Sequence, residues 1–165
     1  MGKLMLVSGI PGAGKSTWIK EHMNWFDEYV SRDEIRFSLL GPDDDYFDKE
    51  NEVFALYIAA IEKALKAGKT VWADATHLNI KARLKVLHAI FPKPTDIDIV
   101  DFQIPLEVAL ERNEGRGGLA KVPRGQIRRM YFSRDEIEFH EGEFTYGTIY
   151  TVDENGKLTM RKEMK

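Results

Sequence analysis

The stretch LVSGIPGAGKSTW, from Leu6 to Trp18, decides the fold of this 165-residue chain. Within it, Gly9–Ser16 matches the pattern G-x-x-x-x-G-K-[ST] without a gap, after an apolar segment and before a helix-like one. Glycines let the backbone curl so that several N–H groups point at phosphate oxygens, and the following helix adds its positive end. The stretch therefore predicts a loop that grips a phosphate chain, with a plain glycine turn as the alternative.

Within this loop each residue type has its own predicted task. Lys15 is expected to reach the β- and γ-phosphates of ATP, and the Ser16 hydroxyl is expected to ligate Mg²⁺. The predicted nucleotide contacts of the loop are Gly12, Ala13, Gly14, Lys15, Ser16 and Thr17. The predicted cofactors are ATP, as phosphate donor, and Mg²⁺. The loop does not name the acceptor, because nucleotide hydrolases, kinases and nucleotide-dependent switches all carry it.

The composition is that of a soluble globular domain, with 43% apolar and 31% charged residues. Cysteine is absent, which excludes disulfides and cysteine-based zinc sites and suits a reducing, cytoplasmic location. No apolar stretch approaches membrane-spanning length, and the N-terminus lacks a signal-peptide pattern, so no membrane partner is expected. The oligomeric state stays open.

Apolar runs alternate with helical patterns along the chain. This alternation predicts an α/β fold with three layers, α/β/α, in which helices cover both faces of a four-stranded parallel sheet. The expected strands are 3–8, 28–31, 69–74 and 96–104, and the expected helices are 15–25, 33–40, 46–68, 79–91, 105–113 and 124–139. A β-hairpin is expected over 147–164, with Asn155-Gly156 at its turn. We therefore expect a P-loop domain over 1–143, with a lid at about 114–123, and over 144–165 a hairpin appendage of the same domain that can add edge strands.

Two carboxylates follow predicted strands at the edge where parallel sheets bind ligands. Asp33, in SRDEIR, can accept the proton of an attacking hydroxyl as general base, or it can cap the helix that begins there. Arg36 shares its helix face and can grip an anionic part of the acceptor, or it is an ordinary surface arginine. Asp74 ends the strand TVWAD and can orient Mg²⁺, hold the acceptor, or serve as a turn residue.

Residues after Asp74 are expected at the same edge of the predicted sheet. Thr76 is expected to contact the acceptor, whereas His77 is expected to be an exposed and incidental histidine. The chain has four histidines, and they are scattered without the spacing of metal ligands. The only metal expected is therefore the Mg²⁺ that accompanies the nucleotide.

The segment ERNEGRGGLAKVP, residues 111–123, can fold over the nucleotide because its glycines permit closure. Arg116 would then stabilise charge on the transferring phosphoryl group, and Arg112 would contact the nucleotide from the helix end. The alternative is a flexible surface loop. From residue 111 to 134, seven basic residues accompany two acidic ones, although the net charge of the chain is −3. Both a local basic surface and ordinary solvated helix faces fit this pattern.

Four motifs together resemble the kinase module of phage-type polynucleotide 5′-hydroxyl kinases, in the P-loop kinase superfamily: GIPGAGKSTW, SRDEIR, ADATHLN and ERNEGRGGLAKVPRGQIRRMY. The resemblance covers about residues 3–139 and implies ATP-dependent phosphorylation of the 5′-hydroxyl end of DNA or RNA. It implies Asp33 as base, Arg36 on an acceptor phosphate, Arg116 in the lid and Arg112 on the nucleotide.

Two further points follow from the resemblance. Ala75 separates Asp74 from Thr76, whereas the family pattern puts the aspartate directly before the threonine, so metal and acceptor roles for Asp74 stay open. The closest match to a phosphatase loop, DIDIVD, lacks the glycine, so a kinase alone is expected. A phage-encoded kinase would act in nucleic acid repair in the host cytoplasm.

Three functions remain in competition. The first is a polynucleotide kinase, which the basic segments favour. The second is a small-molecule kinase acting on a nucleoside, sugar, antibiotic or nucleotide sugar, which the net negative charge favours. The third is a nucleotide-binding switch without phosphotransfer, and Asp33 at the acceptor rim argues against it because a switch needs no general base.

Overall fold

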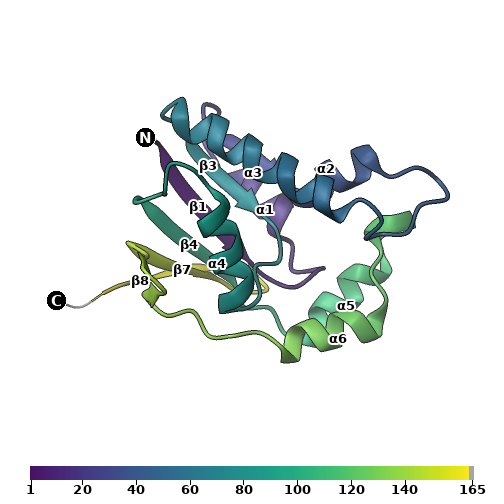
Figure 1. The fold of residues 1–165 in the computed structure, drawn as a ribbon. Coiled ribbons are helices and arrows are strands. Elements are labelled where there is room, and N and C mark those ends of the chain that lie inside the picture. The colour runs from purple at the N-terminus through teal and green to yellow at the C-terminus, as the bar shows by residue number, and fades with distance from the viewer. Residues whose placement is uncertain (164–165) are drawn as a thin grey trace.

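A computed structural model describes residues 1–163, and they form a sheet between two layers of helices (Figure 1). Within these residues the main sheet has six strands in the order β2-β3-β1-β4-β7-β8. Their bounds are β1 Lys3–Ser8, β2 Glu28–Ser31, β3 Thr70–Asp74, β4 Ile97–Phe102, β7 Thr148–Val152 and β8 Leu158–Lys162. Neighbouring strands are parallel except β8, which runs antiparallel to β7. The predicted α/β fold with a mostly parallel sheet is confirmed.

Strand β1 shows why the sheet is covered on both faces. Leu4 and Leu6 pack into an apolar cluster with α3 (Glu50–Lys66) and α4 (Ile80–Ala89). Met5 and Val7 point the other way, into a cluster with α1 (Lys15–His22), α5 (Leu106–Glu114) and α6 (Arg124–Phe132). A strand with four apolar residues in a row, Leu4 to Val7, can bury both faces only between two layers of helices.

The carboxyl ends of the strands meet at one edge of the sheet. β1 lies between β3 and β4, and the register pairs Val7 with Asp74 on one side and Ser8 with Asp101 on the other. β2 ends beside β3, with Ser31 opposite Asp74, and α2 (Arg32–Leu39) begins directly after it. The loop after β1 and the residues after β2 and β3 therefore share this edge, as expected for a parallel sheet.

The C-terminal hairpin adds two strands to the main sheet, beyond the four parallel strands that the sequence predicts. β7 pairs with β4 in parallel, from Ile99 opposite Ile149 to Phe102 opposite Val152, so the described sheet has five parallel strands and not four. The turn of the hairpin contains Gly156 with φ 77°, as the Asn-Gly sequence predicts. The hairpin thus supplies the outer strands of the sheet.

The helix expected over 124–139 is too long. α6 ends at Phe132, after which the Arg134 guanidinium binds the Asp101 carboxylate at 2.8 Å and Asp135 accepts a hydrogen bond from the backbone of Ile80. These contacts hold the segment in a non-helical path across α4 and β4. A short hairpin follows, formed by β5 (His140–Glu141) and β6 (Phe144–Thr145). The expected boundary between 143 and 144 falls inside it, and that division of the chain stays a prediction.

The longest helix is α3, at 17 residues. In the described part of the chain, 1–163, no helix is both long and apolar enough to cross a bilayer.

Candidate active site

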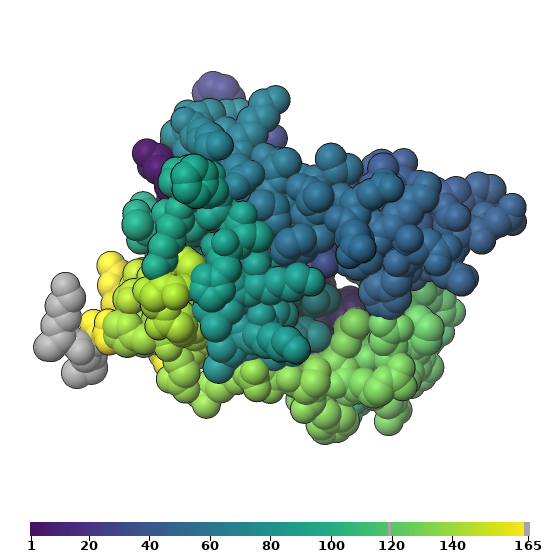
Figure 2. Space-filling view, viewed as in Figure 1, coloured from purple at the N-terminus to yellow at the C-terminus, as the bar shows by residue number. Residues whose placement is uncertain are grey.

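A cavity of about 1000 Å³ opens at the carboxyl edge of the sheet. Figure 2 shows the surface hollowed between the blue lobe of α2 with the loop that follows it and the green lobe of α6, with purple atoms of the N-terminal residues at its floor. Eight predicted site residues line this cavity: Gly14, Lys15, Ser16, Asp33, Arg36, Asp74, Thr76 and Arg116. The residues predicted to hold the donor and those predicted to hold the acceptor therefore face one space.

The P-loop adopts a conformation that its glycines permit. Gly12 and Gly14 have φ of 84° and 82°, and a Cβ on Gly12 would lie 2.4 Å from the Ala109 carbonyl oxygen of α5. The Lys15 ammonium folds back and donates to the carbonyls of Gly9 and Ile10 at 3.0 and 3.1 Å. Burial lowers the pKa of Lys15, and the nearby carboxylates oppose that shift.

The P-loop is anchored to the segment after β3. The Gly9 amide donates to the Thr76 carbonyl at 3.0 Å, and the Ser8 hydroxyl donates to the His77 carbonyl at 2.9 Å. The His77 ring is buried, with Nδ1 2.5 Å from the Val7 carbonyl, so Nδ1 carries the proton. Burial lowers the pKa of His77 to about 3. The expectation that His77 is exposed and incidental is therefore wrong, because it fastens β1 to this loop.

The candidate base Asp33 is not the cap of its helix. Ser31 fills that position, because its hydroxyl accepts from the Glu34 amide at 3.1 Å. The Asp33 side chain is 53% exposed, and its Oδ1 accepts from the Tyr46 hydroxyl at 2.8 Å and from the Arg36 guanidinium. Burial and Asp33 raise the pKa of Tyr46, so its hydroxyl stays protonated and donates. These two donors orient the carboxylate toward the cavity.

Arg36 is buried and already surrounded by partners. Its guanidinium contacts both oxygens of Glu50 at 2.9 Å and lies 4.2 Å above the ring of Tyr46. Arg32 binds the same Glu50 carboxylate at 2.5 Å. The alternative of an ordinary surface arginine is therefore wrong for Arg36. Its positive charge is balanced by Asp33 of the same motif and by Glu50, which the motif does not include.

Asp74 is buried at the end of β3, and one of its oxygens is engaged. The Tyr29 hydroxyl donates to Asp74 Oδ2 at 2.5 Å. Burial raises the pKa of Asp74, while the Lys15 ammonium and the Tyr29 hydrogen bond oppose the shift. Oδ1 is left without a protein partner among the described hydrogen bonds, so it is the oxygen that can serve a ligand.

The lid arginines differ in position. Arg116 lines the cavity, and its Nη1 donates to the Ala120 carbonyl at 3.3 Å, within a lid whose only regular element is η1 (Gly118–Ala120) in the described residues. Arg112 does not line the cavity. Its guanidinium donates to the Ala13 carbonyl at 3.1 Å and to the Glu154 carbonyl at 2.7 Å, so it joins the P-loop to the hairpin turn.

Besides Arg112, three predicted nucleotide contacts of the P-loop lie outside the cavity lining, namely Gly12, Ala13 and Thr17. The lining residues that the sequence analysis missed include Tyr29, Arg32, Tyr46, Phe47 and Glu50. Arg32 stands in the SRDEIR motif without an assigned role, and the other four lie outside every motif, with partners up to 45 residues away in the chain. Only Glu50 carried a signal, as an acidic residue in the first turn of the long helix α3.

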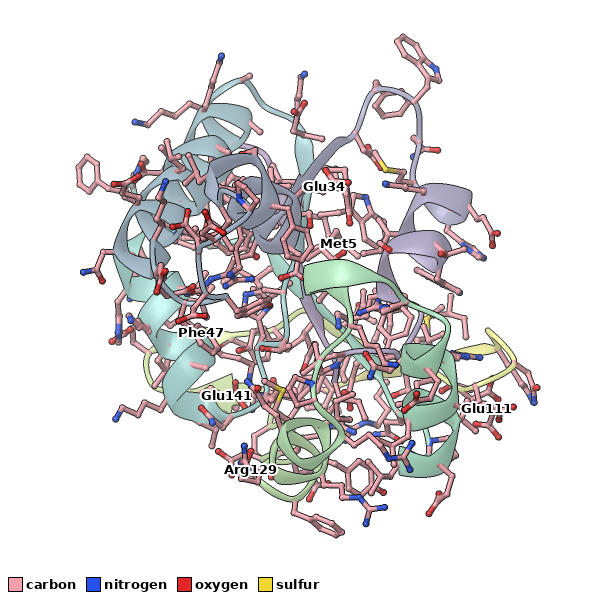
Figure 3. All side chains as sticks on the ribbon, turned by 90° about the vertical axis from the view of Figure 1, so that its right-hand side faces the viewer. Met5, Glu34, Phe47, Glu111, Arg129 and Glu141 are labelled. Atoms are coloured by element: carbon pink, nitrogen blue, oxygen red, sulfur yellow. The ribbon has the colours of Figure 1, made fainter. Side chains whose placement is uncertain are left out.

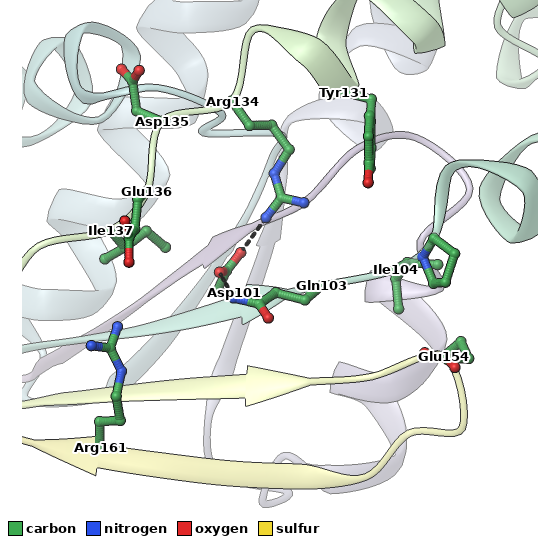
Figure 4. Close-up of a pocket in the computed structure, with 11 residues that line it drawn as sticks. Asp101, Gln103, Ile104, Tyr131, Arg134, Asp135, Glu136, Ile137, Glu154 and Arg161 are labelled. Carbon is green, nitrogen blue, oxygen red and sulfur yellow. Dashed lines mark hydrogen bonds and ion pairs between the residues drawn. The ribbon is translucent and has the colours of Figure 1, made fainter.

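A second pocket, of about 530 Å³, lies beyond β4 and holds none of the predicted site residues (Figure 4). Its floor is the Asp101–Arg134 ion pair at 2.8 Å, and Gln103 donates to the other Asp101 oxygen at 3.1 Å. The polar groups at its floor satisfy one another, so the larger cavity is the candidate active site.

Comparison with known proteins identifies the family and the fold. A family model described as an AAA domain matches residues 4–137. A sugar kinase from Janibacter sp. HTCC2649 is 14% identical with a TM-score of 0.60, covering 94% of this chain and 87% of that chain. A gluconokinase from Sinorhizobium meliloti 1021 is 18% identical with a TM-score of 0.55, covering 92% and 82%.

A chain of the Pnkp1/Rnl/Hen1 complex is 25% identical with a TM-score of 0.57, covering 72% of this chain. The present chain spans only 41% of that larger one. These neighbours share the fold of P-loop kinases, which supports a phosphotransferase. Because the family model covers well over half of the sequence, the chain belongs to this AAA-domain family.

Proposed function

We propose that this protein is an ATP-dependent polynucleotide kinase that transfers the γ-phosphate of ATP to the 5′-hydroxyl end of DNA or RNA. The observation that carries the proposal is the shared cavity, in which Asp33 faces the Lys15 and Ser16 side of the P-loop across one space. A general base and a phosphate-binding loop must face the same cavity before a hydroxyl can attack a phosphoryl group.

The transfer uses these residues in separate roles. Asp33 accepts the proton as the 5′-oxygen forms its bond to the γ-phosphorus. The bond between the γ-phosphorus and the β,γ-bridging oxygen breaks, and the electron pair leaves with ADP. Lys15 and Arg116 face the phosphoryl oxygens on which negative charge spreads.

Mg²⁺ fits the donor set of the cavity. Ser16 supplies a hydroxyl and Asp74 an available carboxylate oxygen, and Mg²⁺ usually takes one or two protein oxygens with water and substrate phosphates. No cluster of three or more His, Cys, Asp or Glu side chains suited to a metal occurs in residues 1–163. When bound, the ion would neutralise phosphate charge, while Tyr29 holds the Asp74 carboxylate in place.

The polynucleotide acceptor is supported by charge beside the cavity. Gln126 and Met130 of α6 line the cavity, while Arg128 and Arg129 of the same helix are exposed. Neither arginine forms an ion pair or side-chain hydrogen bond within the described part of the chain. Helical spacing places Arg128 on the face of α6 opposite Gln126 and Met130, and Arg129 to the side of that face. These arginines therefore suit phosphates of a strand that continues past the cavity, and phosphate contacts supply much of nucleic-acid affinity.

A small-molecule kinase is the second candidate. Arg36 is balanced by Glu50 and Asp33, and Asp45 and Asp48 also line the acceptor side, which disfavours a phosphate there. The solved structures that resemble the chain also include a sugar kinase and a gluconokinase. An acceptor with a hydroxyl but no phosphate would suit these residues.

The test is transfer of labelled γ-phosphate from ATP, with Mg²⁺, to a single-stranded oligonucleotide that ends in a 5′-hydroxyl. A matched oligonucleotide that already ends in a 5′-phosphate is the control. We expect label on the first and none on the second. Folded protein that binds ATP and labels neither DNA nor RNA would refute the proposal.

A further inference from the structure

The acceptor side of the cavity has an aromatic wall, formed by Phe37, Tyr46 and Phe47. The rings of Tyr46 and Phe47 meet edge to face with centroids 4.7 Å apart, and Phe37 contacts Tyr46 from the other side at 6.3 Å. Tyr46 is held by these rings and by Arg36 beneath it. Phe47 is 55% exposed and lies on the opposite side of the molecule from Glu111 in the view of Figure 3.

The wall is placed in a fixed relation to the candidate base. The Tyr46 hydroxyl donates to Asp33. The Phe47 ring packs edge to face against the Tyr46 ring and lies 6.0 Å from the Arg36 guanidinium, which also contacts Asp33. The group attached to a hydroxyl bound at Asp33 would therefore lie beside Tyr46. A ring carried at the far end of that group would be within reach of the Phe47 ring. A nucleoside is built with this spacing, since one sugar ring separates its 5′-hydroxyl from its base.

The charge around Phe47 limits what can lie on it. Asp45 and Asp48 flank Phe47 and line the same cavity. Carboxylates repel a phosphate but tolerate a neutral ring, so the wall suits a flat uncharged group. Every nucleobase has a π-face, and stacking on an aromatic side chain recognises it without regard to sequence.

We infer that Phe47 stacks on the nucleobase of the acceptor's 5′-terminal nucleotide, so that the protein selects ends whose first base is unpaired. This inference rests on the proposed polynucleotide kinase activity and adds a specificity determinant to it. The terminal base must leave a duplex to lie on Phe47, which makes single strands and frayed ends the preferred acceptors.

The experiment compares two single-stranded acceptors that differ only in the terminal base. One is a ten-nucleotide strand with a 5′-hydroxyl, and the other carries an abasic sugar at its 5′ end. We expect the wild-type kcat/KM to be about 10-fold higher for the strand with the base. We expect Phe47→Ala to lower kcat/KM much more for the strand with the base than for the abasic strand, so that the two strands become nearly equal acceptors.

Phe26→Ala is the matched control, because Phe26 is 57% exposed but lies in the loop before β2 and does not line the cavity. It should keep the wild-type preference. The inference alone is overturned if the wild type labels both strands equally well, or if Phe47→Ala keeps the preference. The comparison within the wild type needs no variant to fold. A wild type that labels no oligonucleotide overturns the inference and the proposed function together.

Discussion

At the scale of single residues, Asp33 is the side chain whose role can be measured most cleanly. Its carboxylate is oriented by Tyr46 and Arg36, and it does not cap α2. We expect Asp33→Asn to lower kcat about 100-fold, because the amide cannot accept the proton of the acceptor hydroxyl. ATP affinity, measured by titration calorimetry, should stay near the wild-type value.

Glu34→Gln is the control for this change. Glu34 is the next residue of α2, lines the same cavity and pairs with Lys20 at the surface. It should keep wild-type turnover. Unchanged kcat in Asp33→Asn would remove Asp33 from the mechanism.

Arg116, the arginine of the lid, is the subject of a separate prediction. Arg116 lines the cavity from a lid with little regular structure, which lets it follow the transferring group. We expect Arg116→Ala to lower kcat by about 30-fold or more and to change ATP affinity less, because its charge acts on the transition state. Arg124→Ala, on a lid-side arginine paired with Glu114 and outside the cavity, is the control. A pure loss of ATP affinity would make Arg116 a binding residue only.

The residues that could be predicted from the sequence are those that a local motif carries. Lys15, Ser16, Asp33, Asp74, Thr76 and Arg116 were all placed in one cavity by the order of strands and loops. Tyr29, Tyr46 and Glu50 could not be predicted, because their partners Asp74, Asp33 and Arg36 come from other elements. A contact of this kind exists only once the helices have packed.

At the scale of elements, the close approach of α5 to the P-loop requires a glycine. Gly12 combines a φ of 84° with a Cβ position 2.4 Å from a backbone oxygen of α5. We expect Gly12→Ala to lower the free energy of unfolding by about 3 kcal/mol, from left-handed strain and overpacking. Urea denaturation measures the change.

Gly117→Ala is the matched control for that substitution. A Cβ on Gly117 would meet no atom within 4 Å, and its φ of −112° suits any residue. We expect its unfolding free energy to stay within about 0.5 kcal/mol of wild type. Equal stability of the two variants would show that the contact between α5 and the loop is not tight.

The end of α6 shows where local pattern fails at this scale. Residues 133–139 have helix-compatible composition, so the sequence predicts a helix through them. Instead, Arg134 pairs with Asp101, and Asp135 accepts a hydrogen bond from the backbone of Ile80. A helix that continued through residues 133–139 would not bring these partners together. Tertiary contacts override helix propensity here, which is common because propensity differences are small.

At the scale of the whole molecule, His77 links stability to pH. Its pKa is about 3 in the folded protein against 6.5 for the free side chain, so the unfolded chain binds a proton that the native state does not. The free energy of unfolding should therefore fall as pH drops below 6.5, and this one group accounts for up to about 3 kcal/mol by pH 4.5.

His77→Asn should remove that contribution, since Asn tolerates the positive φ of 39° and keeps a donor near the Val7 carbonyl. His88→Asn, at a half-exposed histidine outside the site, is the control for replacing a histidine with asparagine. Urea denaturation between pH 4.5 and 7.5 gives the slope of stability against pH for each protein. Equal slopes for His77→Asn and wild type would mean that the buried ring is protonated in the native state.

The layered architecture was predictable because apolar runs and helical patterns alternate along the whole chain. Both faces of β1 are apolar, and this pattern alone requires helices on both sides of the sheet. The position of β7 was not predictable, because the hairpin pattern does not say which strand it will join. Strand order depends on long-range pairing, whereas strand existence depends on local pattern.

The most direct test of the central claim is a competition in one reaction. The protein receives labelled ATP and Mg²⁺ with a 5′-hydroxyl oligonucleotide, a nucleoside, gluconate and a neutral hexose at equal concentrations, and the labelled products are separated. The account predicts that the oligonucleotide takes nearly all of the label, with a kcat/KM at least about 100-fold above that of any small acceptor. Label found mainly on gluconate, a sugar or a nucleoside would contradict it.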